Sequence, residues 1–374
     1  MRQVIVAGYG GTDQLRVRET PDPAPGVGQV RIRVRAAGVN FADVLARQGL
    51  YPDAPKPPCV VGYEVSGVVD AAGPHAGADW VGREVFAMTR FGGYADTVVV
   101  AEGQVFGKPA SLSHEQAATL PVNYLTAWQL LVVMGALSPD ETVLIHNAGG
   151  GVGLAAIDVA VHIGARILGT ASPAKHAFLK ERGVQEAIDY RSGDWTREVG
   201  RLTDGRGVEL VIDPLGGAHW RKSWRVLRST GRLGMFGVST ASETGVGGRL
   251  RLLKVALGMP WFNPVMLMNQ NRSAFGVNVG HLWDETAKVD AWMQNPLKGC
   301  ERGLGTSACR PHLRTGGREC CPRVSRATPQ HRQGGAHPLS EASGDGAAAA
   351  FRLGLRRSRR QRGRRSLVLA VGQV

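Results

Sequence analysis

The residues best suited to chemistry form one glycine-rich run, Asn147-Ala148-Gly149-Gly150-Gly151-Val152-Gly153. Residues 143–146 before it, Val-Leu-Ile-His, predict a strand, and residues 154–163 after it predict a helix. Glycines at such a turn let the backbone approach a pyrophosphate, whose charge then lies on free N–H groups at the helix N-terminus. A structural turn would also be glycine-rich, but the order strand, glycines, helix inside a βαβ unit favours a dinucleotide site ending at Gly153.

The end of the second predicted strand, residues 166–169, indicates which dinucleotide is bound. An acidic side chain there accepts a hydrogen bond from the ribose 2′-hydroxyl of NAD and repels a 2′-phosphate. This chain instead reads Gly169-Thr170-Ala171-Ser172-Pro173-Ala174-Lys175-His176, without a carboxylate. Ser172 and Lys175 offer a hydroxyl and a cation, so the segment favours NADPH. The alternative is that Lys175 is a solvated helix residue.

A histidine follows directly on the first strand. His146 could act as a catalytic base, but the end of a buried strand favours a structural histidine whose nitrogens are satisfied by neighbours. We therefore do not place it among the catalytic residues.

The elements that must position these residues fall into an α/β chain of two domains. Short β-type runs separated by Gly and Pro predict a largely antiparallel β domain over residues 1–122. Alternating strands and helices then predict a Rossmann-type, doubly wound parallel sheet that binds NADPH over residues 123–262. Residues 263–299 are expected to form an edge strand and return toward the first domain.

The remaining residues, 300–374, differ in composition from the rest. They contain 15 Arg, no Lys and four acidic residues, a net charge of +11, which leaves only +3 of the chain's +14 for residues 1–299. Three explanations are open: a disordered basic tail, a nucleic-acid-binding extension, or a stretch read in the wrong frame of a GC-rich gene. We favour the last, and the nearly neutral body argues against a nucleic-acid partner.

Seven segments together resemble the medium-chain dehydrogenase/reductase superfamily, in its quinone oxidoreductase branch and most closely the vesicle amine transport protein 1 group. These segments, which span about residues 1–295 and leave 296–374 unmatched, are 38–43, 47–51, 122–127, 147–153, 169–172, 213–217 and 271–272. The resemblance implies a GroES-like catalytic domain, a Rossmann domain and a cleft between them that holds NADPH.

The resemblance also implies roles for single residues. Asn40 would donate to the oxyanion that develops on the acceptor, and Tyr51 would be a second donor or a lid; alternatively, Asn40 caps the helix that starts at Phe41 and Tyr51 packs on a Pro-rich loop. Asn40 also counts among the residues expected to contact the cofactor. The others are Thr126, Gly150, Gly151, Val152, Gly153, Thr170, Ser172, Lys175, Tyr190, Phe236, Gly237 and Ser239.

Zinc ligands of the related metal-dependent branch are missing from this chain. Asn40 stands where that branch has Cys and Tyr63 where it has His, and the cysteine-rich loop of its structural zinc is absent. We therefore expect a reductase without a metal site, which transfers hydride to an electrophilic acceptor such as a quinone or an α,β-unsaturated carbonyl.

A second hypothesis is a low-turnover NADPH-binding protein that acts at membranes. The apolar residues 260–268 could contact lipid, although an edge strand or a dimer contact is the favoured interpretation. The opening residues lack a signal-peptide pattern, so a cytoplasmic protein is expected, and the resemblance implies a homodimer.

Overall fold

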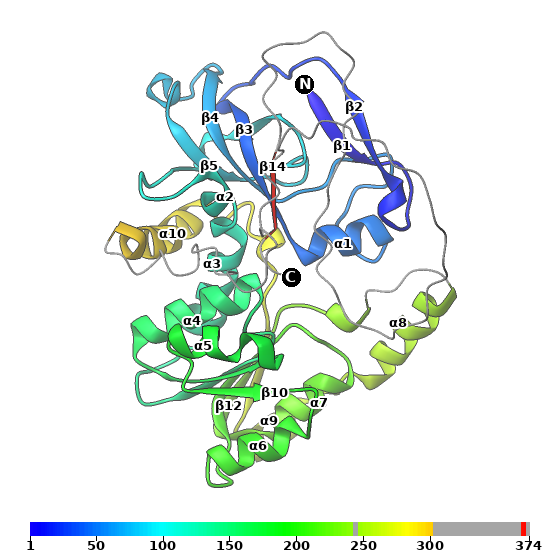
Figure 1. Ribbon diagram of the computed structural model, residues 1–374, viewed down its shortest axis with the longest axis vertical. Coiled ribbons are helices and arrows are strands. Elements are labelled where there is room, and N and C mark those ends of the chain that lie inside the picture. Colours follow the sequence, from blue (N-terminus) through cyan, green and yellow to red (C-terminus); the bar gives the residue numbers. More distant parts are fainter. Residues whose placement is uncertain (242–245, 302–367, 372–374) are drawn as a thin grey trace, which may run out of the picture.

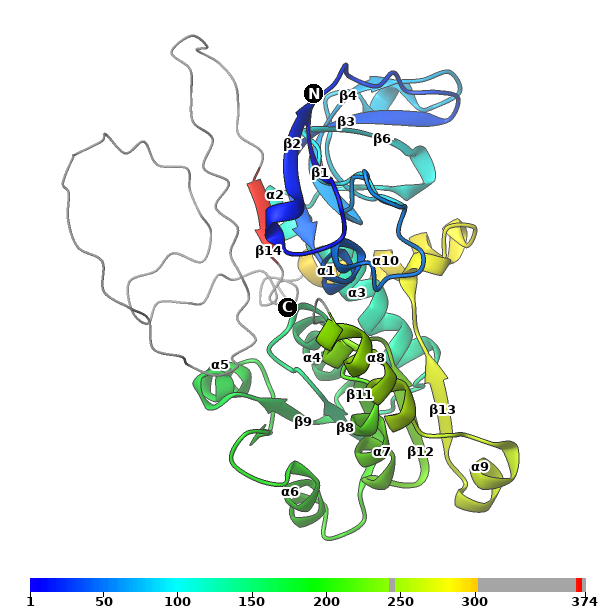
Figure 2. The ribbon, with the colours of Figure 1, turned by 90° about the vertical axis from the view of Figure 1, so that its right-hand side faces the viewer.

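The computed structural model describes residues 1–241, 246–301 and 368–371, and it shows two lobes (Figure 1). The first lobe is built mainly from strands, and the second is a sheet with helices on both faces (Figure 2). Helices α2 (His114–Ala117) and α3 (Leu120–Trp128) lie where the lobes meet, and α10 (Thr286–Glu301) packs on α3. The predicted α/β class, a β-rich domain followed by a Rossmann domain, is confirmed.

The first lobe contains a six-stranded sheet in the order β14-β3-β4-β5-β7, with β6 also paired to β3. A separate antiparallel pair is formed by β1 (Arg2–Val6) and β2 (Leu15–Glu19), and helix α1 (Phe41–Gln48) follows β3. The strands of the larger sheet are β3 (Gln29–Val39), β4 (Glu64–Ala72), β5 (Glu84–Met88), β6 (Thr97–Ala101), β7 (Val105–Gly107) and β14 (Val368–Val371).

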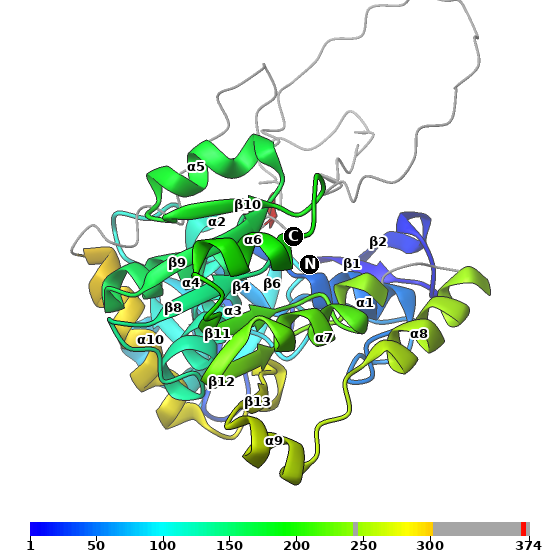
Figure 3. The same ribbon diagram turned by 90° about the horizontal axis from the view of Figure 1, so that it is seen from below.

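The second lobe contains six parallel strands in the order β10-β9-β8-β11-β12-β13. Their bounds are β8 (Thr142–Ile145), β9 (Arg166–Ala171), β10 (Glu186–Asp189), β11 (Val208–Asp213), β12 (Leu227–Met235) and β13 (Ser273–Gly276). The helices are α4 (Gly151–Ile163), α5 (His176–Glu181), α6 (Trp195–Leu202), α7 (Ala218–Arg225), α8 (Val246–Gly258) and α9 (Pro264–Gln270), seen from below in Figure 3. Single-turn 3-10 helices cover Thr12–Gln14, Ala78–Trp80, Glu102–Gln104, Pro173–Lys175, Ser239–Ala241 and Val279–His281, and a π-helix over Gln129–Val133 extends α3.

Side chains of the parallel strands alternate between two buried cores because successive residues of a strand point to opposite faces. In β8, Val143 and Ile145 pack in the core that holds α3 and α4. Leu144 packs in the other core, with Trp195 of α6 and Trp224 of α7. The strands are therefore apolar on both faces, as the continuous run at residues 143–145 predicts.

Two predicted boundaries are wrong. Helix α4 begins at Gly151 rather than at Leu154, because Gly150 takes the N-cap position and the last glycines of the run form the first turn. The apolar segment 260–268 does not hold an edge strand; Asn263 accepts a hydrogen bond from Met266 N (2.9 Å) and Pro264 starts α9. Pro is favoured at the first helical position, so these two residues specify a helix. The edge strand is β13, later in the chain.

Part of the expected out-of-frame tail joins the first lobe. Residues 368–371 form β14, which pairs in parallel with β3 from Val368 opposite Ala36 to Val371 opposite Val39. Residues 300–301, at the end of α10, and residues 368–371 thus belong to secondary-structure elements, and the three explanations for residues 300–374 stay open. Residues 302–367, on which the reading-frame hypothesis mainly rests, lie outside the described part of the chain.

A buried ion pair ties three helices together. Asp158 of α4 accepts from Tyr124 Oη of α3 (2.6 Å) and from Arg182 Nη2, which follows α5 (2.7 Å). The Arg182 side chain is only 5% exposed. Loss of the carboxylate would leave a buried guanidinium without its counter-charge.

We expect Asp158→Ala to lower the free energy of unfolding by about 3–5 kcal/mol, the usual cost of an uncompensated buried charge. Urea denaturation monitored by circular dichroism would measure the change. The matched control is Glu198→Ala, which removes an exposed carboxylate paired with Arg201 and should change stability little. Equal, small losses of unfolding free energy in both variants would contradict a stabilising role of the buried Asp158–Arg182 pair.

Candidate active site

The glycine-rich run turns sharply between β8 and α4. Asn147 has a left-handed φ of 52°, and Gly150 N donates to Asn147 O (2.9 Å). A Cβ on Gly151 would lie 2.6 Å from Asn123 Oδ1 of α3, and a Cβ on Gly153 would lie 2.4 Å from Asn147 O. The glycines therefore let the start of α4 pack closely against α3 and the preceding loop, at a helix N-terminus of the kind that binds phosphate groups.

Lys175 lies against this turn. Its Nζ donates to Gly149 O (3.0 Å), and Ser172 is the N-cap of the single-turn helix that contains Lys175. The predicted cation and hydroxyl thus lie between the glycine run and the end of β9. Thr170, by contrast, is buried, and its Oγ1 lies 3.0 Å from His146 Nδ1. Its hydroxyl therefore has a partner within the protein.

The other predicted cofactor residues of this lobe follow neighbouring strands. Tyr190 follows β10 and is half exposed, with the Arg191 guanidinium 5.7 Å from its ring centroid. Phe236, Gly237 and Ser239 follow β12, and Ser239 N donates to Pro214 O (2.9 Å). All of these residues lie at the carboxyl ends of parallel strands, the edge where open α/β sheets bind ligands.

In the first lobe, Asn40 caps α1 and contacts a buried carboxylate. Its Nδ2 donates to Glu64 Oε1 (2.9 Å), and Glu64 Oε2 accepts from Val122 N of α3 (2.9 Å). Glu64 is 1% exposed. Thr126, one turn further along α3, donates its hydroxyl to Val122 O (2.6 Å). The helix-capping role that the sequence left open for Asn40 is present, and one N–H of its amide is committed to Glu64.

A second buried carboxylate lies beside this pair. Asp43 accepts hydrogen bonds from Asn40 N (2.9 Å), Gly62 N (3.0 Å) and Tyr94 Oη (3.0 Å). Burial raises the pKa of Asp43 to about 6, and burial also raises the pKa of Glu64 to about 8. Sequence reasoning missed both carboxylates; the only available signal was an acidic residue inside a stretch that is otherwise apolar.

Tyr51 faces the segment that follows β13. Its Oη lies 3.4 Å from Asn278 Oδ1, and its ring meets the Tyr63 ring edge-on at 6.2 Å between centroids. Burial raises the pKa of Tyr51, so its hydroxyl is a proton-bearing donor at neutral pH. Nearby, His281 Nε2 lies 2.8 Å from Asp53 Oδ2. These contacts join the loop after α1 to the other lobe.

A zinc ion does not fit at the position used by the zinc-dependent branch. Asn40 offers an amide that is already bonded to Glu64, and Tyr63 offers a phenol whose pKa burial raises far above its usual range. Zinc takes thiolate, imidazole or carboxylate ligands. We therefore derive no catalytic step through a metal.

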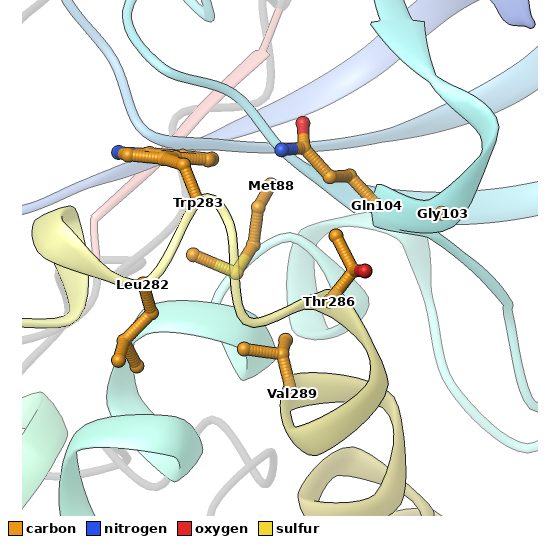
Figure 4. A pocket seen from close by; sticks show the side chains of 7 residues that line it. All are labelled: Met88, Gly103, Gln104, Leu282, Trp283, Thr286 and Val289. Atoms are coloured by element: carbon orange, nitrogen blue, oxygen red, sulfur yellow. The ribbon is translucent and has the colours of Figure 1, made fainter.

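Figure 4 shows a small apolar pocket that is separate from these residues. It lies between the first lobe and the start of α10. Its lining residues are Met88, Gly103, Gln104, Leu282, Trp283, Thr286 and Val289. None of them is a predicted site residue, so this pocket is not the candidate active site.

Two family models match the chain: the alcohol dehydrogenase GroES-like domain over residues 26–110 and the zinc-binding dehydrogenase over residues 151–295. The synaptic vesicle membrane protein VAT-1 homolog of Danio rerio is 38% identical over 299 residues, which are 78% of this chain and 60% of that protein. The homolog from Mus musculus is 36% identical over 299 residues, 78% of this chain and 72% of that protein. The match thus spans less than two thirds of the Danio rerio relative.

Solved structures with the same fold cover most of the chain. A quinone oxidoreductase from Pseudomonas syringae has a TM-score of 0.71 and 29% identity, covering 82% of this chain and 94% of its own. A mycobacterial protein complexed with NADPH has a TM-score of 0.70 and 29% identity, with coverage of 81% and 89%. The CurK enoyl reductase has a TM-score of 0.70 and 27% identity, with the same coverage.

The buried acids predict a pH dependence of stability. For an acid whose native-state pKa is raised, the folded chain binds more protons than the unfolded chain between the two pKa values, so stability falls as pH rises through that window. For Asp43 the upper limit of this pH range is about 6, and for Glu64 it is about 8. Between pH 6 and 8, Glu64 should lower the unfolding free energy by up to about 1.4 kcal/mol per pH unit.

We expect Glu64→Gln, which cannot ionise, to remove this slope between pH 6 and 8. Urea melts at several pH values would measure it. Glu84→Gln is the control, because Glu84 is exposed and the pKa of its carboxyl is lowered, mainly by Lys108. A slope that persists in Glu64→Gln would show that another group, and not Glu64, causes the pH dependence.

Proposed function

Because this chain belongs to the medium-chain dehydrogenase/reductase family, we propose that it is an NADPH-dependent, zinc-independent reductase that transfers hydride to a quinone or an α,β-unsaturated carbonyl. One observation carries the proposal: the glycine run, Lys175 and the residues after β12 share one edge of the parallel sheet. The NADPH complex of the mycobacterial relative and the quinone and enoyl reductase relatives support the cofactor and the acceptor class.

The chain's own groups would bind and polarise the acceptor. Bound NADPH supplies a hydride from nicotinamide C4, which places two electrons on the acceptor and leaves an oxyanion that takes a proton from solvent. Tyr51 would donate its hydroxyl hydrogen to that oxyanion, and the second N–H of the Asn40 amide would be the other donor. Glu64 would hold the Asn40 side chain in place through the 2.9 Å bond to its first N–H.

A variant of Lys175 tests the preference for NADPH over NADH. We expect Lys175→Ala to weaken NADPH binding at least about tenfold and NADH binding little, because a charge-assisted hydrogen bond contributes roughly 1.5–3 kcal/mol. Fluorescence titration with both nucleotides would measure the two dissociation constants. Lys180→Ala, on the exposed side of α5, is the control. Equal losses for NADPH and NADH would contradict a role for Lys175 at the 2′-phosphate.

The activity itself is tested by NADPH oxidation with a panel of 1,2- and 1,4-quinones and enones. We expect turnover that prefers NADPH over NADH, and we expect Tyr51→Phe to lower kcat by roughly a hundredfold, the cost of one oxyanion donor. Tyr9→Phe, which alters an exposed tyrosine, is the control. NADPH binding without turnover of any acceptor would contradict the reductase proposal.

The second candidate, an NADPH-binding protein that acts at membranes, rests on exposed apolar side chains of α8, α9 and their connection. These are Leu253, Leu257, Trp261, Val265 and Met268, and residues 246–270 contain no acidic side chain. In the described residues, no helix is long and apolar enough to cross a bilayer. Such side chains would contact a membrane surface. Co-sedimentation with anionic liposomes, in a chain that binds NADPH but reduces no acceptor, would favour this candidate.

A homodimer in the cytoplasm remains part of the proposal. Size-exclusion chromatography with light scattering would test the assembly.

A further inference from the structure

Three side chains of metal-binding type meet at the carboxyl edge of the Rossmann sheet. They are His146, which follows β8, Asp213, which ends β11, and His219 in the first turn of α7. One ligand atom of each lies within 4.8 Å of the others. His146 and Asp213 are fully buried, and the His219 side chain is 19% exposed.

The strand alternation explains why these residues meet. Leu144 of β8 and Val211 of β11 both point to the face covered by α6 and α7. His146 and Asp213 come two residues later, so they continue on the same face. Since α7 starts five residues after Asp213, its first turn brings His219 over the same point. Fold topology alone therefore assembles two imidazoles and one carboxylate.

Outer hydrogen bonds orient two of the three ligands. Thr170 Oγ1 lies 3.0 Å from His146 Nδ1, and Leu215 N donates to Asp213 Oδ1 (2.7 Å). The opposite atoms, His146 Nε2 and Asp213 Oδ2, face the same small space. His219 Nδ1 and Ser223 Oγ each lie 2.6 Å from Asp213 Oδ2, and Ser223 Oγ lies 3.2 Å from His146 Nε2. Ligands fixed from behind in this way are typical of metal sites.

We propose that His146, Asp213 and His219 form a binding site for Zn²⁺, built from other residues than the proposed acceptor site at Asn40 and Tyr51 and located at the same sheet edge as the glycine-rich run. Two imidazole nitrogens and one carboxylate oxygen are a ligand set that zinc accepts, and the carboxylate balances part of the ion's charge. Ser223 Oγ or a water would occupy the fourth position.

Binding requires a small rearrangement and no oxidant or other reactant. Two ligands of one tetrahedral zinc lie roughly 3.4 Å apart, so His219 and Asp213 must separate from their 2.6 Å hydrogen bond. In a neutral His219 the proton would shift from Nδ1 to Nε2. His219 is the partly exposed member, so the ion would enter from its side. The bound ion would join β8, β11 and α7 and stabilise the folded chain by mass action.

The experiment uses the full chain, depleted of metal, with its five cysteines alkylated so that thiolates cannot bind the ion. Competition with a chromophoric chelator gives the affinity for Zn²⁺, and elemental analysis gives the stoichiometry. We expect one tight equivalent per chain and a higher Tm with Zn²⁺. His219→Gln should lower the affinity for that Zn²⁺ at least about tenfold and abolish the Tm shift. Even the loss of an outer partner of a metal ligand lowers metal affinity by about 10–100-fold.

His162→Gln is the matched control, because His162 is an exposed histidine on α4 and its loss should change neither value. The side-chain amide that His219→Gln introduces can still donate to Asp213, and the Tm of the metal-free variants would verify folding. Asp213→Asn, which keeps the shape but removes the charge, should also weaken binding. Equal affinity in wild type, His219→Gln and Asp213→Asn, or no tight equivalent in wild type, would overturn the proposal and leave a hydrogen-bonded cluster only.

Discussion

The position of the candidate active site depends on one buried carboxylate. Glu64 begins a strand of the first lobe, yet one of its oxygens accepts from the backbone of α3, on which the Rossmann lobe packs, and the other accepts from Asn40. A buried polar group without hydrogen-bond partners is costly whether or not it is ionised, so neither partner of Glu64 can be lost without consequence. The same two bonds that satisfy Glu64 therefore fix α1 and its cap relative to α3. Loop 51–53 and the segment after β13 complete this junction from the opposite side.

Much of the second lobe could be predicted from the sequence, because its signals are local. Each of these signals is a short stretch of sequence: the apolar run at 143–145 with the glycines directly after it, and the Ser172 and Lys175 that stand where an NAD site has a carboxylate. A parallel sheet then brings the ends of all its strands to one edge, so the local motifs predict which edge binds the dinucleotide. Lys175 lies against the glycine run through its hydrogen bond to Gly149 O, and its role at a 2′-phosphate stays a prediction.

The rest could not be predicted because it depends on residues far apart in the chain. Nothing near Asn40 indicates that its amide bonds to a carboxylate 24 positions later, and nothing near His146 indicates that Ser223, 77 positions later, lies beside its ring. Thr170 shows the same limit: its position in a cofactor motif suggests a free hydroxyl, but tertiary packing places it against His146. Helix α9 is a different case, since Asn263 and Pro264 were readable local signals that the apolar composition of the segment obscured.

The pairing of β14 with β3 has a consequence for how the chain is made. Val368 lies beside Ala36, so this edge of the first sheet stays open until more than 300 further residues have left the ribosome. All strands of the Rossmann sheet, by contrast, lie between residues 142 and 276, and that lobe can fold while synthesis continues. The order in which the two lobes can be completed is thus the reverse of the order in which they are synthesised: the lobe that is made first is the last to be completed. During that interval, residues 36–39 of β3 present an unpaired edge beyond the part that β6 covers, and such edges are surfaces on which nascent chains associate with one another.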